Sequence, residues 1–185
     1  MPTGHTDAQR RERILTAALD FIAEEGIQSV SHRKIAARAG VPLGSMTYYF
    51  SGMDELLRAA FRHFMDHIMS VFDAHLRTPA DPDQARQAVA DLVYVLSTGD
   101  RRDVVLTQEL CTLSARRPAY RELTNEWMRR SRVHLEKHFD PDTSRQLTAL
   151  ITGLILHHTL SRQVHDQALT VEAISRITTT ARSSH

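Results

Sequence analysis

Residues 31–57 read SHRKIAARAGVPLGSMTYYFSGMDELL and contain two short helical patterns that meet at a glycine. Ser31 is a good N-cap, because its hydroxyl can accept a hydrogen bond from a backbone amide two or three residues later. The residues that then fall on one side of the first helix are Ile35, Ala36 and Ala39. Gly40 can take the left-handed conformation that a tight interhelical turn requires. The spacing predicts a helix-turn-helix motif.

The second helix of this motif, about residues 43–50, has an apolar inner face and an outer face without acids. Val41, Met46 and Phe50 point inward at helical intervals. The outer side chains are of kinds that suit a major groove, where hydroxyls meet base edges or phosphates and leucine can touch a thymine methyl. The predicted DNA-binding residues are Ser31, Arg33, Leu43, Gly44, Ser45, Thr47, Tyr48 and Tyr49. The glycine taken alone would equally fit an ordinary turn between core helices.

Together with residues 10–26, RRERILTAALDFIAEEG, the motif resembles the N-terminal domain of the TetR family of bacterial transcriptional regulators. The matching residues are Ile14, Ala17, Ala18, Phe21, Gly26, Ile35, Ala36, Ala39, Gly40, Val41, Gly44, Tyr48, Phe50, Glu55 and Leu56. The resemblance covers the first third of the chain, and the remainder matches only as a helical pattern. It implies a DNA-binding homodimer on a palindromic operator, acting as a repressor that a small molecule releases.

Two residues depart from the pattern of that family. Met53 stands where the family often has a lysine that contacts phosphate, and Thr47 stands where a tyrosine is frequent. Backbone amides at the start of the following helix can still bind a phosphate. The remaining predicted contacts, Tyr48 and Tyr49 among them, must then carry more of the phosphate binding.

Composition indicates a globular protein that stays in the cytoplasm. The 185 residues are 42% hydrophobic and 24% charged, and 23 Lys and Arg nearly balance 22 Asp and Glu. The basic residues of the first forty positions still form a local excess that can contact phosphates. One cysteine excludes an internal disulfide, and no apolar run approaches the length that spans a membrane.

The pattern predicts an all-α fold with a three-helix DNA-binding domain, residues 1–52, followed by a six-helix domain, residues 53–185, for ligand binding and dimerisation. Ser51 is expected to cap a long fourth helix. Asp81-Pro82 and Asp140-Pro141 each read as an N-cap followed by the first helical residue. The seventh helix is expected to reach Phe139.

Two further sets of residues are predicted in the second domain. Methionine and aromatic side chains suit an adaptable apolar pocket as well as a filled core. The candidate pocket residues are Phe64, Met65, Met69, Phe72, Tyr94, Cys111, Trp127 and Met128. The resemblance implies that the last two helices pair with their copies in a dimer, and the candidate interface residues are Leu147, Leu150, Ile151, Leu154, Ile155, His158, Ile174 and Ile177.

No catalytic motif or cofactor-binding motif is found in the chain, so neither an enzyme nor a cofactor is expected. Histidines stand four apart at His63 and His67 and at His134 and His138, a spacing that can share a metal on one helical face. Most such pairs are solvated, and no metal site is predicted. They nevertheless motivate an alternative, a helical metal- or ligand-sensing protein whose N-terminal module binds another protein.

Overall fold

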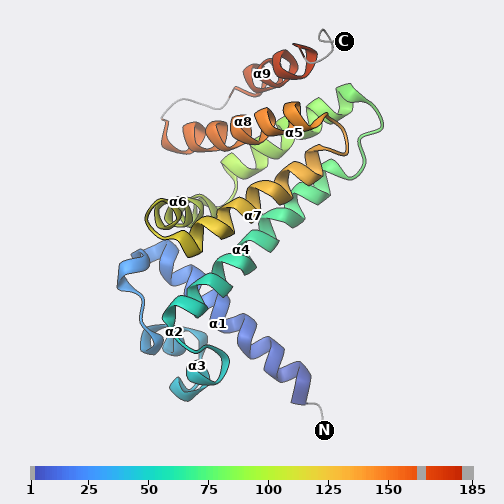
Figure 1. Cartoon of the computed structure of the whole chain (residues 1–185). Coiled ribbons are helices and arrows are strands. Elements are labelled where there is room, and N and C mark those ends of the chain that lie inside the picture. The colour runs from blue at the N-terminus through green and yellow to red at the C-terminus, as the bar shows by residue number, and fades with distance from the viewer. Residues whose placement is uncertain (1–2, 162–165, 181–185) are drawn as a thin grey trace. The chain divides into compact units, whose positions relative to one another are not determined.

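The computed structural model describes residues 3–161 and 166–180, in which the chain forms nine α-helices, one short 3-10 helix and no strand (Figure 1). The predicted all-α fold is confirmed. In chain order the elements are α1 (Thr3–Glu25), η1 (Ile27–Ser29), α2 (His32–Ala39), α3 (Leu43–Tyr49), α4 (Met53–Leu76), α5 (Pro82–Thr98), α6 (Arg101–Arg116), α7 (Pro118–Leu135), α8 (Pro141–Leu160) and α9 (Gln167–Thr180).

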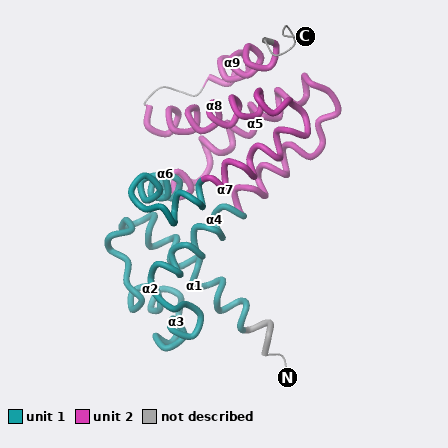
Figure 2. Tube along the Cα trace, viewed as in Figure 1, with its two compact units in different colours: residues 1–66, 105–124 teal, residues 67–104, 125–185 magenta. Residues whose placement is uncertain are grey.

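The helices form two compact units (Figure 2). Unit 1 comprises residues 1–66 and 105–124, and unit 2 comprises residues 67–104 and 125–185. Helices α4, α6 and α7 contribute residues to both units. The division into domains at residues 52 and 53 stays a prediction, because compactness alone does not define where a function begins.

The core of unit 1 joins the first three helices to the start of α4. Helix α2 packs against both α1 and α3, and apolar residues that recur at helical spacing on these helices are buried. Its fully buried members are Ile14, Ala18, Ile22, Ile35, Met46, Leu56 and Ala60. The helix-turn-helix motif is therefore held by packing of its two helices against each other and of α2 against α1.

Unit 2 packs α5 against both α8 and α9. Its fully buried apolar residues include Val89, Leu92, Val93, Leu147 and Ile174. Polar contacts join the same helices: Asp91 on α5 accepts from Nε2 of Gln167 at 2.9 Å, and Ser97 Oγ lies 3.3 Å from Nδ1 of His158. The apolar stripe of α5 is thus covered by the last two helices of its own chain.

The two predicted Asp-Pro caps are confirmed. Asp81 Oδ1 accepts from the amides of Asp83 and Gln84 at 2.9 and 2.8 Å, and Asp140 caps α8 in the same way. Hydrogen bonds from Thr143 hold the pKa of the Asp140 carboxyl below its usual value. The predicted end of the seventh helix at Phe139 was wrong, because α7 ends at Leu135 and a turn follows. That turn allows His138 Nε2 to reach the Leu76 carbonyl at 2.8 Å.

Candidate nucleic-acid interface

Helix α2 begins at the predicted cap. Ser31 has extended backbone angles, and its Oγ accepts from the Lys34 amide at 3.3 Å. Lys34 turns back toward the preceding segment, donating to the Ser29 carbonyl at 3.1 Å and lying 3.8 Å from a Glu25 carboxylate oxygen. Arg33 is exposed and pairs with no acid within the part of the chain that the structure describes. Of these two cations, Arg33 is the one available to an external phosphate.

The turn between α2 and α3 depends on Gly40. Its φ of 62° and ψ of 41° place it in the left-handed region, and its amide closes α2 on the carbonyls of Ala36 and Ala37. A residue with a side chain is strained in this conformation. The Val41 amide also bonds back to Ala36, at 3.0 Å. These bonds set the direction in which α3 leaves α2, as the glycine position predicts.

Helix α3 presents the two faces that the sequence predicts. Met46 and the adjoining Phe50 are buried in the core, with Val41 beside them. On the opposite face Tyr48 is 73% exposed and Leu43 is 54% exposed, although both are large and partly apolar. Gly44 and Thr47 are exposed as well. An uncharged face that leaves a leucine and a tyrosine in solvent is suited to contact another molecule.

Some of the predicted hydroxyl contacts are already used within the chain. Thr47 Oγ1 donates to the Gly44 carbonyl at 3.1 Å, and the Tyr49 hydroxyl donates to Asp7 near the start of α1. The bond to Asp7 raises the pKa of Tyr49, because ionisation of the phenol would place two negative charges together. Tyr49 thus ties α3 to α1, and Tyr48 has the hydroxyl that is better placed for an outside partner.

The prediction that Ser51 caps α4 was wrong about the hydrogen bonds that Ser51 forms. Ser51 does not accept from the first turn of the helix; its amide and its hydroxyl both donate to Glu55 Oε2, at 2.7 and 2.6 Å. These two bonds hold the pKa of the Glu55 carboxyl below its usual value. The amide of Leu56 bonds to the Gly52 carbonyl, so α4 begins one residue after Gly52, at Met53. Glu55 therefore links the first turn of α4 to the residue that follows Phe50.

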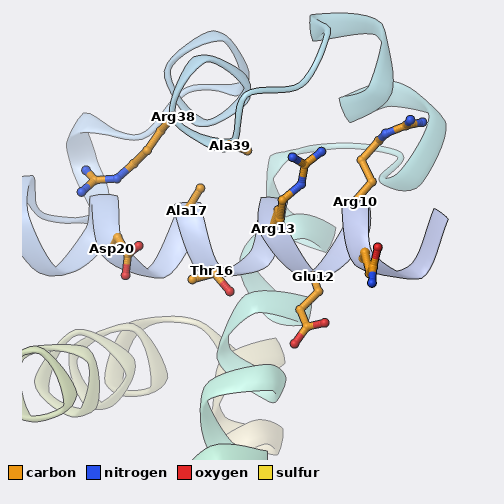
Figure 3. A pocket seen from close by; sticks show the side chains of 9 residues that line it. Arg10, Glu12, Arg13, Thr16, Ala17, Asp20, Arg38 and Ala39 are labelled. Atoms are coloured by element: carbon orange, nitrogen blue, oxygen red, sulfur yellow. The ribbon is translucent and has the colours of Figure 1, made fainter. Parts of the chain in front are cut away.

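Two arginines of the predicted basic excess lie together on α1. A hollow of about 780 Å³ lies between α1 and the end of α2, and Arg10, Arg13 and Arg38 are among its lining residues. Figure 3 shows Arg10 and Arg13 on the same side of α1, with Glu12 on the opposite side. Arg11 instead lies over the Phe50 ring, 5.4 Å from its centre. Arg10 and Arg11 are neighbours in the sequence, but residues three apart, such as Arg10 and Arg13, lie on the same side of a helix.

Arg38 contributes less to this side than its position suggests, because Glu24 neutralises it. Both terminal nitrogens of Arg38 bond to the carboxylate of Glu24. The pair lowers the pKa of Glu24 and raises that of Arg38. The positive charge left for a phosphate beside the motif is therefore that of Arg10, Arg13 and Arg33.

Two family models match the chain. Residues 14–60 match the model of the bacterial regulatory proteins of the tetR family, and residues 80–180 match a tetracyclin repressor-like C-terminal domain. The chain belongs to the TetR family. The resemblance drawn from the N-terminal third is thereby confirmed over both parts of the chain. Regulators of this family are DNA-binding transcriptional regulators, typically repressors that respond to ligands.

Solved structures of TetR-family proteins share the fold. The proposed transcriptional regulator SCO7518 from Streptomyces coelicolor A3(2) is 71% identical, with a TM-score of 0.89 over 92% of this chain and 99% of that one. The multidrug binding protein EbrR, in complex with ethidium, is 36% identical, with a TM-score of 0.76 over 91% of this chain and 98% of that one.

A relative compared by sequence alone is the HTH-type transcriptional regulator BetI 1 of Chromohalobacter salexigens. It is 27% identical over 83% of this chain and 81% of its own length.

The predicted pocket residues of this TetR-family chain fall in both units. Phe64, Met65 and Cys111 belong to unit 1, and the other five belong to unit 2. In unit 2, Met69 and Phe72 are buried and Trp127 is half-buried, whereas Tyr94 and Met128 are exposed. Phe72 packs beside His134, with ring centres 6.3 Å apart. The pocket stays a prediction.

The predicted dimer residues divide into two groups by burial. Leu147, Ile151 and Ile174 are buried within their own chain, in contact with the core around α5. The other five are only half-buried: Leu150, Leu154, Ile155, His158 and Ile177. The second group retains apolar surface that a partner helix could cover. The interface itself stays a prediction.

The paired histidines of the TetR-family chain make separate contacts. His67 Nε2 lies 3.4 Å from Asp103, and His138 bonds to the Leu76 carbonyl. His134 Nδ1 lies 3.8 Å from Asp73, too far for a hydrogen bond, and burial lowers the pKa of this imidazole. No cluster of three or more metal-ligating side chains occurs among the described residues. In the same part of the chain, no helix is long and apolar enough to cross a membrane.

Proposed function

We propose that this protein is a repressor that binds a two-fold symmetric DNA operator as a homodimer and leaves it when a small molecule binds. The observation that carries the proposal is the outer face of α3, where Leu43 and Tyr48 are exposed without an acid beside them. Arg33 at the start of α2 and Arg13 on α1 add positive charge for the phosphates on either side. Such a protein acts in the cytoplasm, where bacterial DNA lies.

Two copies are required for useful selectivity. A seven-residue recognition helix reaches only a few base pairs. A symmetric dimer doubles the number of base contacts and places the two half-sites about one helical turn apart or a little more, roughly 34–36 Å. The operator is therefore expected to be an inverted repeat.

Helices α8 and α9 support this dimer. Leu160 and Leu169 are 72% and 62% exposed, and Leu150 and Leu154 on α8 are only partly covered by their own chain. Gly153 lies among them with open space around the position of a Cβ atom. Glycine inside a helix costs about 1 kcal/mol relative to alanine. Nothing within the described chain requires glycine at this position, whereas close approach of a second helix would.

Selection of bound sequences from a random DNA pool tests the proposal. We expect the native protein to enrich one dyad-symmetric sequence, and to bind it far more tightly than unrelated duplex at the same salt concentration. Enrichment of an asymmetric sequence would contradict the two-fold arrangement. Failure to bind any duplex, even at low salt, would contradict DNA binding itself and favour a protein-interaction module.

Substitutions at Thr47 and Tyr48 distinguish base reading from phosphate contact. Thr47→Ala is expected to relax the preference at one base-pair position of each half-site, by about 1 kcal/mol or more, because Thr47 is exposed on α3 and its methyl group and hydroxyl oxygen stay accessible while the hydroxyl proton bonds to Gly44. Tyr48→Phe should weaken operator and unrelated DNA by the same factor, because a phosphate contact carries no sequence information. Competition binding against a set of single-base operator variants measures both. Negligible effects of both substitutions would refute this orientation of α3.

The proposed effector is a flat aromatic cation. EbrR, 34–36% identical to this chain, has been solved with ethidium, malachite green and proflavin. In unit 2 of this chain, Met69 and Phe72 on α4 are buried and Trp127 on α7 is half-buried, so a ligand that binds among them meets thioether and aromatic side chains of the core. Such surfaces stack on aromatic rings and attract cations. Because α4 also contributes residues to unit 1, a change in α4 would extend to the start of the helix beside α3.

Trp127 provides a direct test, because it is the single tryptophan of the chain. Malachite green is expected to change the fluorescence of Trp127 in the absence of DNA, and to release the enriched operator over the same concentration range. Malachite green is preferable to ethidium, which intercalates into the operator itself. Tetramethylammonium, a cation without rings, serves as the control. Release of DNA without a change at Trp127 would place the effector elsewhere.

A further inference from the structure

The corner between α6 and α7 belongs to the same compact unit as the helix-turn-helix motif. The single proton of the buried Ser114 hydroxyl is shared between two carbonyl oxygens, that of Leu110 at 2.7 Å and that of Tyr120 at 2.9 Å. The Arg117 amide bonds to the Leu113 carbonyl at 2.7 Å. These bonds fix the end of α6 to the start of α7. The α6–α7 corner can therefore hold the side chains that pack against it in defined positions.

Tyr120 reaches from this corner to the start of α4. Its side chain is fully buried, its ring makes an edge contact with Phe61, and its hydroxyl donates to Asp54 Oδ1 at 2.9 Å. Burial, together with the bond to Asp54, raises the pKa of Tyr120 to about 12. The phenol thus stays protonated, and remains a donor, throughout the physiological pH range.

Asp54 and Glu55, in the first turn of α4, bond to two different partners. Asp54 accepts a hydrogen bond from Tyr120 and forms an ion pair with Arg58 at 3.1 Å. Arg117 is a second cation, 4.0 Å from the Asp54 carboxylate. Glu55 accepts from the backbone and side chain of Ser51, immediately after α3. Adjacent carboxylates on one helical turn therefore connect the end of α3 to the beginning of α7. The sequence separation of Asp54 and Tyr120 is 66 residues.

A second contact joins α6 to the other end of the motif. Gly26, with φ of 79°, lies where the chain turns from α1 toward α2. A Cβ atom at Gly26 would lie 3.7 Å from Glu109 Oε1 on α6. Helix α6 therefore lies close to the chain before α2, and the start of α7 lies close to the chain after α3.

We propose that Tyr120 and Asp54 are positioning residues for operator binding, which hold the first turn of α4, and through Glu55 and Ser51 the end of α3, in the orientation that fits the major groove. The inference rests on the proposed DNA-binding function. Neither side chain contacts DNA. The hydrogen bond between them sets the orientation of α3. Its loss therefore weakens the fit of α3 to the operator and leaves the charges that contact phosphates unchanged.

Tyr120→Phe tests the proposal, because it removes the hydroxyl and keeps the buried ring. Affinity for the operator enriched by the native protein is expected to fall about tenfold, within the usual range of coupling between sites. Affinity for unrelated duplex, and its dependence on salt, should not change. Thr124→Val is the matched control: it removes a buried hydroxyl from the same helix and unit, one that bonds only to the Arg121 carbonyl among the contacts described.

A double-mutant cycle with Asp54→Ala identifies the partner. If the bond carries the effect, Tyr120→Phe changes operator affinity less than about twofold when Asp54 is already absent. A Tyr120→Phe protein that unfolds at lower temperature but binds the operator like the native protein would overturn the positioning role and leave DNA binding intact. Additive effects in the cycle would also overturn it. If the native protein binds no DNA, the proposed function and this inference both fail.

Discussion

The Leu154→Asp protein is expected to be a monomer at concentrations where the native protein is dimeric, and to lose operator binding. Leu154 is half-buried on α8, beside Gly153. Because part of Leu154 is already covered by its own chain, burying the remainder in an interface contributes about 1 kcal/mol, and a two-fold interface contains the substitution twice. The loss of about 2 kcal/mol weakens dimerisation roughly thirtyfold, and the cost of burying two like charges adds to it.

Sedimentation velocity and operator binding, measured on the same samples, check this expectation. Val133→Asp is the matched control, because Val133 is 50% exposed on α7 and lies outside the proposed dimer face. Both variants should retain native helix content, which circular dichroism reports. A Leu154→Asp protein that sediments as a dimer would exclude this part of α8 from the interface. A monomer that still binds the operator tightly would contradict the need for two copies.

The sequence predicts the parts of this protein that depend on local chemistry. Ser31 and Gly40 mark the ends of α2, and the Asp-Pro pairs mark two later helix starts, because caps and left-handed turns depend on a few adjacent residues. The faces of α3 also follow from helical spacing alone.

Contacts between distant residues could not be predicted in this way. Tyr49 has the sequence of a phosphate contact, yet Asp7 takes its hydroxyl. The bond between Tyr120 and Asp54 leaves no local pattern, because a tyrosine in a helix is more often explained by packing. Each of these assignments depends on which helix lies opposite, and that is a property of the three-dimensional fold.

Gly44 and Gly153, two glycines that lie within helices, are explained best by partners outside the chain. Gly44 on α3 and Gly153 on α8 both have open space around the position of a Cβ atom. Each weakens its helix by about 1 kcal/mol relative to alanine. Gly153 lies on the proposed dimer face, and Gly44 lies on the face proposed to enter the major groove. Neither glycine is required by a contact within the described chain, although each lowers helix stability. We therefore expect another molecule to approach closely at both positions.

Gly44→Leu is therefore expected to change stability and DNA binding in opposite directions. The folded chain gains helix propensity and meets no steric obstacle, so its unfolding temperature should rise or stay unchanged. Operator binding should fall roughly a hundredfold or more, because the new side chain displaces a base-pair contact worth about 1–3 kcal/mol in each of two half-sites. Gly44→Ala should show a smaller loss of the same sign.

Ala115→Leu separates this effect from a general response to added apolar bulk. Ala115 is an exposed residue of α6 in the same unit as Gly44, outside the helix-turn-helix motif, and its replacement should leave operator affinity unchanged. Thermal unfolding and operator titration of all three variants provide the comparison. If Gly44→Leu binds the operator as tightly as the native protein, DNA does not approach α3 at Gly44, and the helix must enter the groove with its axis rotated toward Tyr48. If Gly44→Leu loses stability and binding together, the defect lies in the fold of α3, and close approach of DNA no longer explains the glycine.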